Sequence, residues 1–354
     1  MNEKRSINLG VIGMGLNNMA STLALLKTAP GLRYRLQAVC SLPQSLVDQC
    51  VRQFGASFGT TDYRELVERK DVDVVCVFSP DHLHAEHCIA ALEAGKHVVC
   101  TKPMVTRLED AKKMAALVRK KKVKFLVGQT MRFDRQFMTA KKLFDDGDLG
   151  KLIALESYYV HDMRPVFKST PWRLTMPQDL MFGGCVHSID VIRAFGGDVD
   201  TVHANVVKGN LTKQYPLPDN FFLNLKFKSG VMGRVSGLYG IVHPPTPMMQ
   251  FGIYGTKGSL QAEFTDNEPG QIRVVLDKLS SHKPMTSVFE PERDVSAYGH
   301  GATVIRYMRH FQECLDRDIE PSPSVLDGAK SVAVGVAAWE SIKNNAVVKV
   351  YNGF

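Results

Sequence analysis

The first 130 residues alternate between short apolar runs and segments of helical periodicity, which constrains the fold more than any other feature. The apolar runs have the length of buried strands and lie at 7–12, 36–40, 72–78, 97–100 and 125–128. The helical patterns between them lie at 16–27, 46–54, 63–68, 84–94 and 108–121. This alternation predicts a parallel sheet with helices on both faces.

After about residue 150 the pattern changes to successive strands joined by glycine-containing turns such as Ser229-Gly230. The expected strands lie at 153–160, 202–207, 221–227, 231–238, 250–254, 259–262 and 272–276. Short turns between consecutive strands are typical of an antiparallel sheet. Helical patterns accompany these strands at 187–194, 303–316 and 326–344.

We therefore predict an α/β protein of two domains, since 354 residues exceed what one hydrophobic core usually supports. Residues 1–128 form an N-terminal Rossmann domain with a doubly wound parallel sheet. Residues 129–354 form a C-terminal α+β domain with a large, mostly antiparallel open sheet for substrate binding and oligomerisation. The last helix, about 326–344, is a candidate to pack back on the first domain.

Composition excludes several classes of function. The net charge of +8 comes from 44 basic residues scattered among 36 acidic ones without a nucleic-acid-binding motif, so we expect no nucleic-acid partner. Seven cysteines without a Cys-x-x-Cys pair indicate reduced thiols and no thiolate metal site. No apolar run has membrane-spanning length and no signal-peptide core follows the N-terminus, so we expect a cytoplasmic protein without a membrane partner.

A glycine-rich loop follows the first expected strand. Gly13 and Gly15 match the first two glycines of a Gly-x-Gly-x-x-Gly fingerprint, and Asn18 replaces the third. The first glycine permits a tight turn, and the second lets the backbone approach a pyrophosphate. The helix that begins at Leu16 and Asn17 then supplies free N–H groups for the phosphates. This pattern predicts a bound dinucleotide.

The end of the second strand bears on the choice of dinucleotide. An acidic residue there usually binds the adenosine ribose, whereas this chain has Cys40-Ser41. Without a carboxylate a 2′-phosphate meets no repulsion, and Ser41 can donate a hydrogen bond to it, which favours NADP over NAD. No arginine follows directly, so NAD stays open.

Three further motifs make the prediction specific: Ser79-Pro80-Asp81-His82-Leu83-His84, Ala90-Ala91-Leu92-Glu93-Ala94-Gly95-Lys96-His97-Val98 and Thr101-Lys102-Pro103. They resemble the Gfo/Idh/MocA oxidoreductase family, whose members have TPN-x-x-H, AL-x-AGKHV and EKP in this order. The resemblance continues to Gly299-His300-Gly301 and so covers nearly the whole chain. It implies hydride transfer at a carbinol carbon of a sugar, inositol or related polyol, in dimers or tetramers built through the outer face of the C-terminal sheet.

The resemblance also implies roles for individual residues. Ser79, Pro80, His84 and Thr101 are expected on the cofactor side, and the histidines at 82, 84 and 87 fit that helix start better than a metal site. Lys102 is expected to orient or polarise the substrate oxygen, and His187 to act as general acid/base. The alternatives are an ordinary surface lysine and a histidine that only begins a helix. The candidate substrate-binding residues are Arg132, Trp172, Arg173, Asp190 and His300.

Two departures from the family pattern leave the reaction open. Thr101 replaces the usual glutamate before Lys102, and Gly183 replaces an aspartate four residues before His187. Asp190 or Asp179 could orient the histidine instead. We therefore weigh three functions: an NAD(P)-dependent sugar or polyol oxidoreductase, a glycoside-cleaving enzyme that oxidises its substrate transiently, and a non-catalytic dinucleotide-sensing regulator.

Overall fold

The computed structural model describes residues 5–14, 29–264, 270–278, 284–289 and 301–354. The chain divides into two units. Unit 1 comprises residues 1–130 and 292–329 together with Phe354, and unit 2 comprises residues 131–291 and 330–353. No helix among the described residues is long and apolar enough to cross a membrane.

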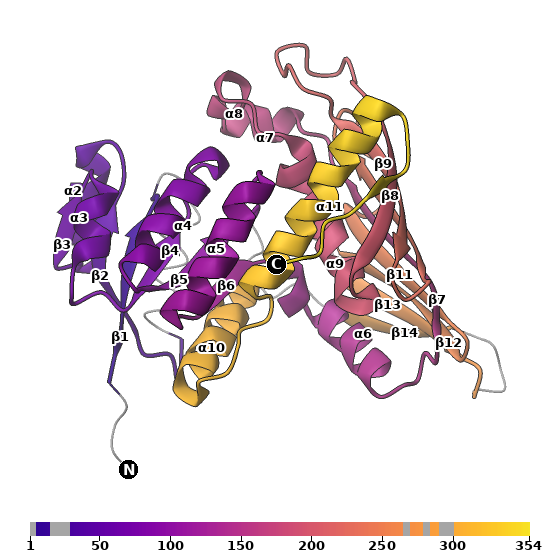
Figure 1. Cartoon of the computed structure of the whole chain (residues 1–354), viewed down its shortest axis with the longest axis horizontal. Coiled ribbons are helices and arrows are strands. Elements are labelled where there is room, and N and C mark those ends of the chain that lie inside the picture. Colours follow the sequence, from indigo (N-terminus) through magenta and orange to yellow (C-terminus); the bar gives the residue numbers. More distant parts are fainter. Residues whose placement is uncertain (1–4, 15–28, 265–269, 279–283, 290–300) are drawn as a thin grey trace. The chain divides into compact units, whose positions relative to one another are not determined.

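Unit 1 is built on a six-stranded parallel sheet with the strand order β3-β2-β1-β4-β5-β6 (Figure 1). The strands are β1 (Ile7–Ile12), β2 (Tyr34–Cys40), β3 (Phe58–Thr60), β4 (Val74–Val77), β5 (His97–Thr101) and β6 (Phe125–Gly128). All four residues of β4 are buried, as expected of a strand covered on both faces. The order is that of a Rossmann sheet and confirms the doubly wound architecture.

The helices of unit 1 alternate with these strands. They are α2 (Gln44–Phe54), α3 (Tyr63–Glu68), the 3-10 turn η1 (Asp81–Leu83), α4 (His84–Glu93) and α5 (Leu108–Lys121). A further helix of this unit, α10 (Gly301–Arg317), comes from much later in the chain. α2 ends at Gly55, whose φ of 72° gives the left-handed conformation that commonly closes a helix. The expected helix at 16–27 lies outside the described residues.

The segment 292–329 belongs to unit 1, whereas the sequence analysis placed it in the second domain. Hydrogen bonds explain this difference. The Tyr34 hydroxyl donates to the Met308 carbonyl at 2.8 Å, and the Arg33 N–H donates to Gln312 Oε1 at 2.8 Å. α10 is therefore fastened to the start of β2, a long-range contact that sequence periodicity does not reveal.

Unit 2 is built on a nine-stranded sheet with the order β14-β13-β12-β11-β7-β10-β9-β8-β15. The strands are β7 (Leu152–Val160), β8 (Val199–Val207), β9 (Asn220–Phe227), β10 (Met232–Leu238), β11 (Met249–Gly255), β12 (Gly258–Phe264), β13 (Gly270–Leu276), β14 (Met285–Phe289) and β15 (Val348–Lys349). β7 and β10 pair in parallel, and the other neighbours pair antiparallel. This arrangement confirms the expected mostly antiparallel sheet.

Helices cover one face of this sheet. The helices of unit 2 are α6 (Arg135–Asp145), α7 (Arg164–Ser169), α8 (Trp172–Thr175), α9 (Val186–Gly196) and the part of α11 (Val325–Asn344) that belongs to this unit. α6 and α9 meet the sheet at an aromatic cluster, where the Phe195 ring centroid lies 5.2 Å from that of Phe137 and 5.9 Å from that of Phe251. Along β9 buried and exposed residues alternate, so Phe222 lies on the opposite, uncovered face.

Candidate active site

The candidate cofactor half of the site lies where β1 and β4 end. Gly13 follows β1 with a φ of 96°. A side-chain carbon at Gly13 would lie 2.6 Å from the backbone of Phe78 and Ser79, so only glycine fits between the two strand ends. The close approach agrees with the role of the first glycine in a dinucleotide-binding loop. Gly15, Leu16 and Asn17 lie outside the described residues.

Ser41 supports the same loop from the end of β2. The Met14 N–H donates a hydrogen bond to Ser41 Oγ at 3.1 Å, and the Gly13 N–H donates to the Cys40 carbonyl at 2.9 Å. Ser41 is largely buried. The residue expected to bind a 2′-phosphate is therefore also a structural support of the glycine loop.

Lys102 comes directly after β5 and is half-buried. The Lys102–Pro103 peptide bond is cis. Because β1, β4 and β5 are neighbours in a parallel sheet, Gly13, Ser79 and Lys102 all lie at the same edge. Open α/β sheets bind ligands at this edge, where the strand order reverses.

The His84 side chain contacts the segments that follow β4 and β5. The side chain is buried, with Nε2 2.7 Å from the Ser79 carbonyl oxygen and Nδ1 2.7 Å from the Pro103 carbonyl oxygen. Both ring nitrogens are thus engaged by backbone. We therefore interpret His84 as fixing the loops that present Ser79 and Lys102, and not as a direct cofactor ligand. Among the described residues no group of three or more potential ligands is placed to hold a metal ion.

His187 begins the candidate substrate half, in unit 2. A π-helical turn, Met181–Cys185, runs directly into α9, and His187 lies in the first turn of that helix with 8% of its surface exposed. Turns of this kind occur frequently at functional sites. The Tyr159 ring, from β7, stands edge-on to His187 at 6.1 Å and to Tyr239 at 5.2 Å.

The two glycines of the π-helical turn make room for side chains from elsewhere in unit 2. A side-chain carbon at Gly183 would lie 2.6 Å from Gln178 Cδ, and one at Gly184 would lie 2.3 Å from the Tyr239 hydroxyl oxygen. The space beside position 183 is therefore filled by the Gln178 amide. Sequence reasoning missed Gln178, Tyr159 and Tyr239, because a glycine pair indicates free space without indicating what occupies it.

Two expected substrate-binding residues, Trp172 and Arg173, are in contact with one another, and Arg173 also contacts Gln178. The Arg173 guanidinium lies 4.3 Å from the centroid of the Trp172 ring, and its Nε donates to Gln178 Oε1 at 3.4 Å. Stacking on an aromatic ring holds the guanidinium in a defined position. Trp172, Arg173 and Gln178 thus form a continuous chain of contacts that ends beside Gly183.

The other expected polar residues have structural contacts. Arg132 forms a buried ion pair with Asp190, at 2.7 Å between Nε and Oδ2. Asp179 accepts hydrogen bonds from the Trp339 indole and from the Met181 N–H, both at 2.8 Å. Both carboxylates considered as orienting groups for His187 are thus engaged in holding helices together. His300 lies outside the described residues.

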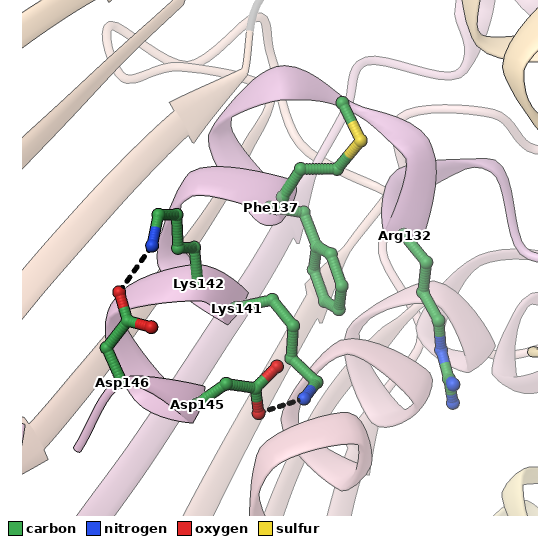
Figure 2. A pocket seen from close by; sticks show the side chains of 7 residues that line it. Arg132, Phe137, Lys141, Lys142, Asp145 and Asp146 are labelled. Atoms are coloured by element: carbon green, nitrogen blue, oxygen red, sulfur yellow. Dashed lines mark hydrogen bonds and ion pairs between the residues drawn. The ribbon is translucent and has the colours of Figure 1, made fainter.

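Arg132 also lines an open surface pocket of about 340 Å³ beside α6. In Figure 2 the ammonium groups of Lys141 and Lys142 point to the carboxylates of Asp145 and Asp146, one helical turn further along. The charges around this pocket are therefore paired with one another. This arrangement gives a charged ligand little to bind.

Comparison with known protein families gives two matches. Residues 7–129 match the NAD-binding Rossmann-fold model of the Gfo/Idh/MocA oxidoreductase family. Residues 141–350 match the C-terminal alpha/beta-domain model of the same oxidoreductase family. The two matches together include the candidate cofactor half and the candidate substrate half.

Curated proteins and solved structures with full-length similarity include two dehydrogenases. Levoglucosan dehydrogenase of Pseudarthrobacter phenanthrenivorans is 25% identical, over 98% of this chain and 98% of that protein. The scyllo-inositol 2-dehydrogenase (NAD(+)) of Bacillus subtilis is 24% identical, over 98% and 97%. A structure of levoglucosan dehydrogenase with NADH and levoglucosan, 23% identical, shows the same fold with a TM-score of 0.85 over 98% of this chain and 100% of that one.

Proposed function

This chain belongs to the Gfo/Idh/MocA family of NAD-binding oxidoreductases, and from that premise we propose a hydride transfer between a nicotinamide and a sugar, inositol or related polyol. The reacting group is a secondary alcohol or the corresponding ketone. One observation supports this most directly: Lys102 and the glycine loop that starts at Gly13 lie at the same edge of the parallel sheet, where a dinucleotide is expected. The names of the similar dehydrogenases, which act on levoglucosan and scyllo-inositol, support the substrate class.

Each catalytic residue has a proposed task. The bound nicotinamide supplies the hydride acceptor. Lys102 holds the substrate oxygen by hydrogen bond and stabilises the negative charge that develops on it. His187 takes the hydroxyl proton during oxidation and returns it during reduction, because an imidazole nitrogen can accept and donate a proton. Trp172 and Arg173, held by the contact with Gln178, bind the other hydroxyl groups of the substrate.

We infer that NADP is accepted in preference to NAD. The argument rests on the end of β2, where Ser41 stands instead of a carboxylate that would repel a 2′-phosphate. The NAD(+) and NADH in the names of similar proteins belong to those proteins and favour the opposite choice.

We also propose a homodimer or homotetramer formed through the uncovered face of the nine-stranded sheet. Phe222 and Met232 are 44% and 60% exposed on neighbouring strands of that face. Exposed apolar side chains on one face of a sheet favour a protein interface. All seven cysteines are buried free thiols, which supports a reducing, cytoplasmic location.

The test is a comparison of cofactor binding with turnover in Lys102→Met and His187→Gln. Each variant should still bind NADPH or NADH, measured by nicotinamide fluorescence, and lose about 100- to 10,000-fold of kcat on a panel of inositols, sugars and anhydrosugars. Lys120→Met, on the exposed side of α5, and His203→Gln, on β8, are the matched controls. Full turnover in either test variant would exclude its catalytic role. Cofactor binding without turnover by the wild type would favour a dinucleotide-sensing regulator.

The glycine at position 183 favours a second candidate function, glycoside cleavage with transient oxidation of the substrate. With the Gln178 amide in place of a carboxylate beside the turn before His187, the proton transfer differs from that of a simple dehydrogenase. Oxidising a sugar hydroxyl makes the neighbouring C–H acidic, so the glycosidic substituent can leave by elimination; addition of water and return of the hydride complete the cycle. Release of the phenol from an aryl glycoside without net change in nicotinamide absorbance would identify this reaction.

A further inference from the structure

His84 is placed so that its ring must carry two protons. Nδ1 and Nε2 each lie 2.7 Å from a backbone carbonyl oxygen, of Pro103 and Ser79 respectively. A carbonyl oxygen only accepts hydrogen bonds, and a neutral imidazole has only one N–H. Both contacts are hydrogen bonds only when His84 is an imidazolium.

A buried cation requires a neighbouring anion, because an isolated charge is very costly away from water. Cys100 of β5 is the candidate: its side chain is fully buried and interacts with the charge of His84 and with the thiol of Cys88 on α4. Burial alone raises the pKa of a thiol, but the hydrogen bond from Cys88 and the His84 charge lower the pKa of Cys100 to about 6. Burial likewise opposes the charge on His84, yet Cys100 and the two carbonyls raise the pKa of His84 to about 9.

The neighbouring histidine shows that this environment is specific to His84. His87 lies three residues further along α4 and hydrogen-bonds through Nδ1 to Ser79 Oγ at 2.8 Å. Burial, opposed in part by Glu86 and reinforced by the His84 charge, lowers the pKa of His87 to about 4. His87 is therefore neutral near pH 7. The nearby carboxylate of Glu86 is exposed and ion-paired with Arg64, so it is not a buried counter-charge for His84.

We propose that His84 and Cys100 form a buried imidazolium–thiolate pair, and that this pair positions Lys102 for the reaction. Neither residue touches the reacting atoms in this proposal. The Lys102 backbone is fixed on one side by the pairing of Thr101 with Gly128, and on the other by the hydrogen bond from His84 to the Pro103 carbonyl. The same imidazolium holds the Ser79 carbonyl and so couples the loop after β4 to the loop after β5.

A competing state has a neutral Cys100 thiol, because Cys100 Sγ also lies 3.2 Å from the Thr101 carbonyl oxygen and a thiol can donate to it. Nuclear magnetic resonance of protein with isotope-labelled histidine separates the two states without any activity measurement. We expect His84 to show two protonated ring nitrogens above the pH at which ordinary histidines lose their charge. We also expect a thiolate ultraviolet absorbance that is lost in Cys100→Ser and retained in Cys50→Ser. A neutral His84 near pH 7 without thiolate absorbance would overturn the ion pair.

The positioning role rests on the proposed function of Lys102 and is tested by kinetics. In Cys100→Ser, a nearly isosteric change, kcat should fall by roughly 10- to 100-fold, since a displacement of about 1 Å costs up to about 100-fold. The KM for substrate and the affinity for the nicotinamide cofactor should stay nearly unchanged. Cys50→Ser, a buried thiol on α2, is the control, and His84→Gln is the second test variant.

The outcomes distinguish this inference from the proposed function. An unchanged kcat in Cys100→Ser, with the ion pair seen by spectroscopy, would refute positioning and leave the proposed oxidoreductase intact. Loss of cofactor binding equal to the loss of kcat would also refute it, because general loosening of unit 1 would then explain the effect. If the wild type transfers no hydride at all, the proposed function fails, and the spectroscopic measurement alone still decides whether the pair exists.

Discussion

Arg132 and Asp190 form a buried ion pair with two hydrogen bonds, from Nε to Oδ2 and from Nη2 to Oδ1, each of 2.7 Å. The Asp190 side chain is 1% exposed and that of Arg132 10%. The pair fastens the turn η2 (Thr130–Phe133) to α9, the helix that begins beside His187. Within unit 2 the ion pair therefore holds α9, the helix that carries the candidate catalytic residue His187, in place.

Asp190→Ala should destabilise unit 2 by about 3–5 kcal/mol, because a buried arginine loses its counter-charge. Both tryptophans of the chain, Trp172 and Trp339, belong to unit 2, so tryptophan fluorescence during urea unfolding reports on this unit. Asp145→Ala removes an exposed ion pair on α6 and should change the free energy of unfolding by less than about 1 kcal/mol. Equal effects of the two substitutions would show that the buried pair has no special role.

Gly183→Asp introduces the carboxylate that the family usually has, but into space that Gln178 occupies. Since the new side-chain carbon would lie 2.6 Å from Gln178 Cδ, we expect a loss of about 1–3 kcal/mol in stability from overpacking. The double variant Gln178→Ala with Gly183→Asp should recover most of that loss, because it removes the obstructing amide. Urea unfolding of the single and double variants measures the coupling between the two positions. Additive effects would contradict the contact between them.

The regular elements could be predicted from the sequence because local patterns determine them. The apolar runs of β1, β4 and β5 and the glycine at position 13 are enough to indicate the parallel sheet and the loop at its edge. β3 was missed because its three residues, Phe58–Thr60, are too few to show a pattern. Within the site, Lys102 and His187 were located by motif, but their supporting contacts were not.

Those supporting contacts join positions far apart in the sequence, where periodicity gives no information. Arg132 and Asp190 are 58 residues apart, and each alone resembles a polar residue available to substrate. His84 was expected to contact the cofactor because it stands in the cofactor-side motif. Only the fold shows that both of its ring nitrogens are engaged by the backbone of Ser79 and Pro103.

Phe222→Asp with Met232→Lys should weaken or abolish self-association, because charged side chains would replace apolar ones on the uncovered sheet face. The wild-type protein is expected to sediment as a dimer or tetramer, and the double variant as a smaller species. Met138→Lys, at an exposed position on α6 away from that face, is the matched control. A monomeric wild type, or a double variant that assembles like the wild type, would exclude this face as the interface.

Ser41→Asp should reverse the choice of nicotinamide dinucleotide. The new carboxylate can accept hydrogen bonds from the ribose hydroxyls of NADH, and it repels the 2′-phosphate of NADPH. We expect the affinity for NADPH to fall at least about tenfold, equivalent to about 1.4 kcal/mol, while that for NADH is kept or improved. Nicotinamide fluorescence titrations measure both affinities.

Ser229→Asp, in an exposed turn of unit 2, controls for the added negative charge. Because Ser41 Oγ also accepts the Met14 N–H, a general weakening of both dinucleotides would mean that the substitution damaged the glycine loop; Ser41→Thr, which keeps the hydroxyl, should then restore binding. Tighter binding of NADH than of NADPH by the wild type would contradict the proposed preference. It would show that the missing carboxylate at the end of β2 does not decide which dinucleotide this protein uses.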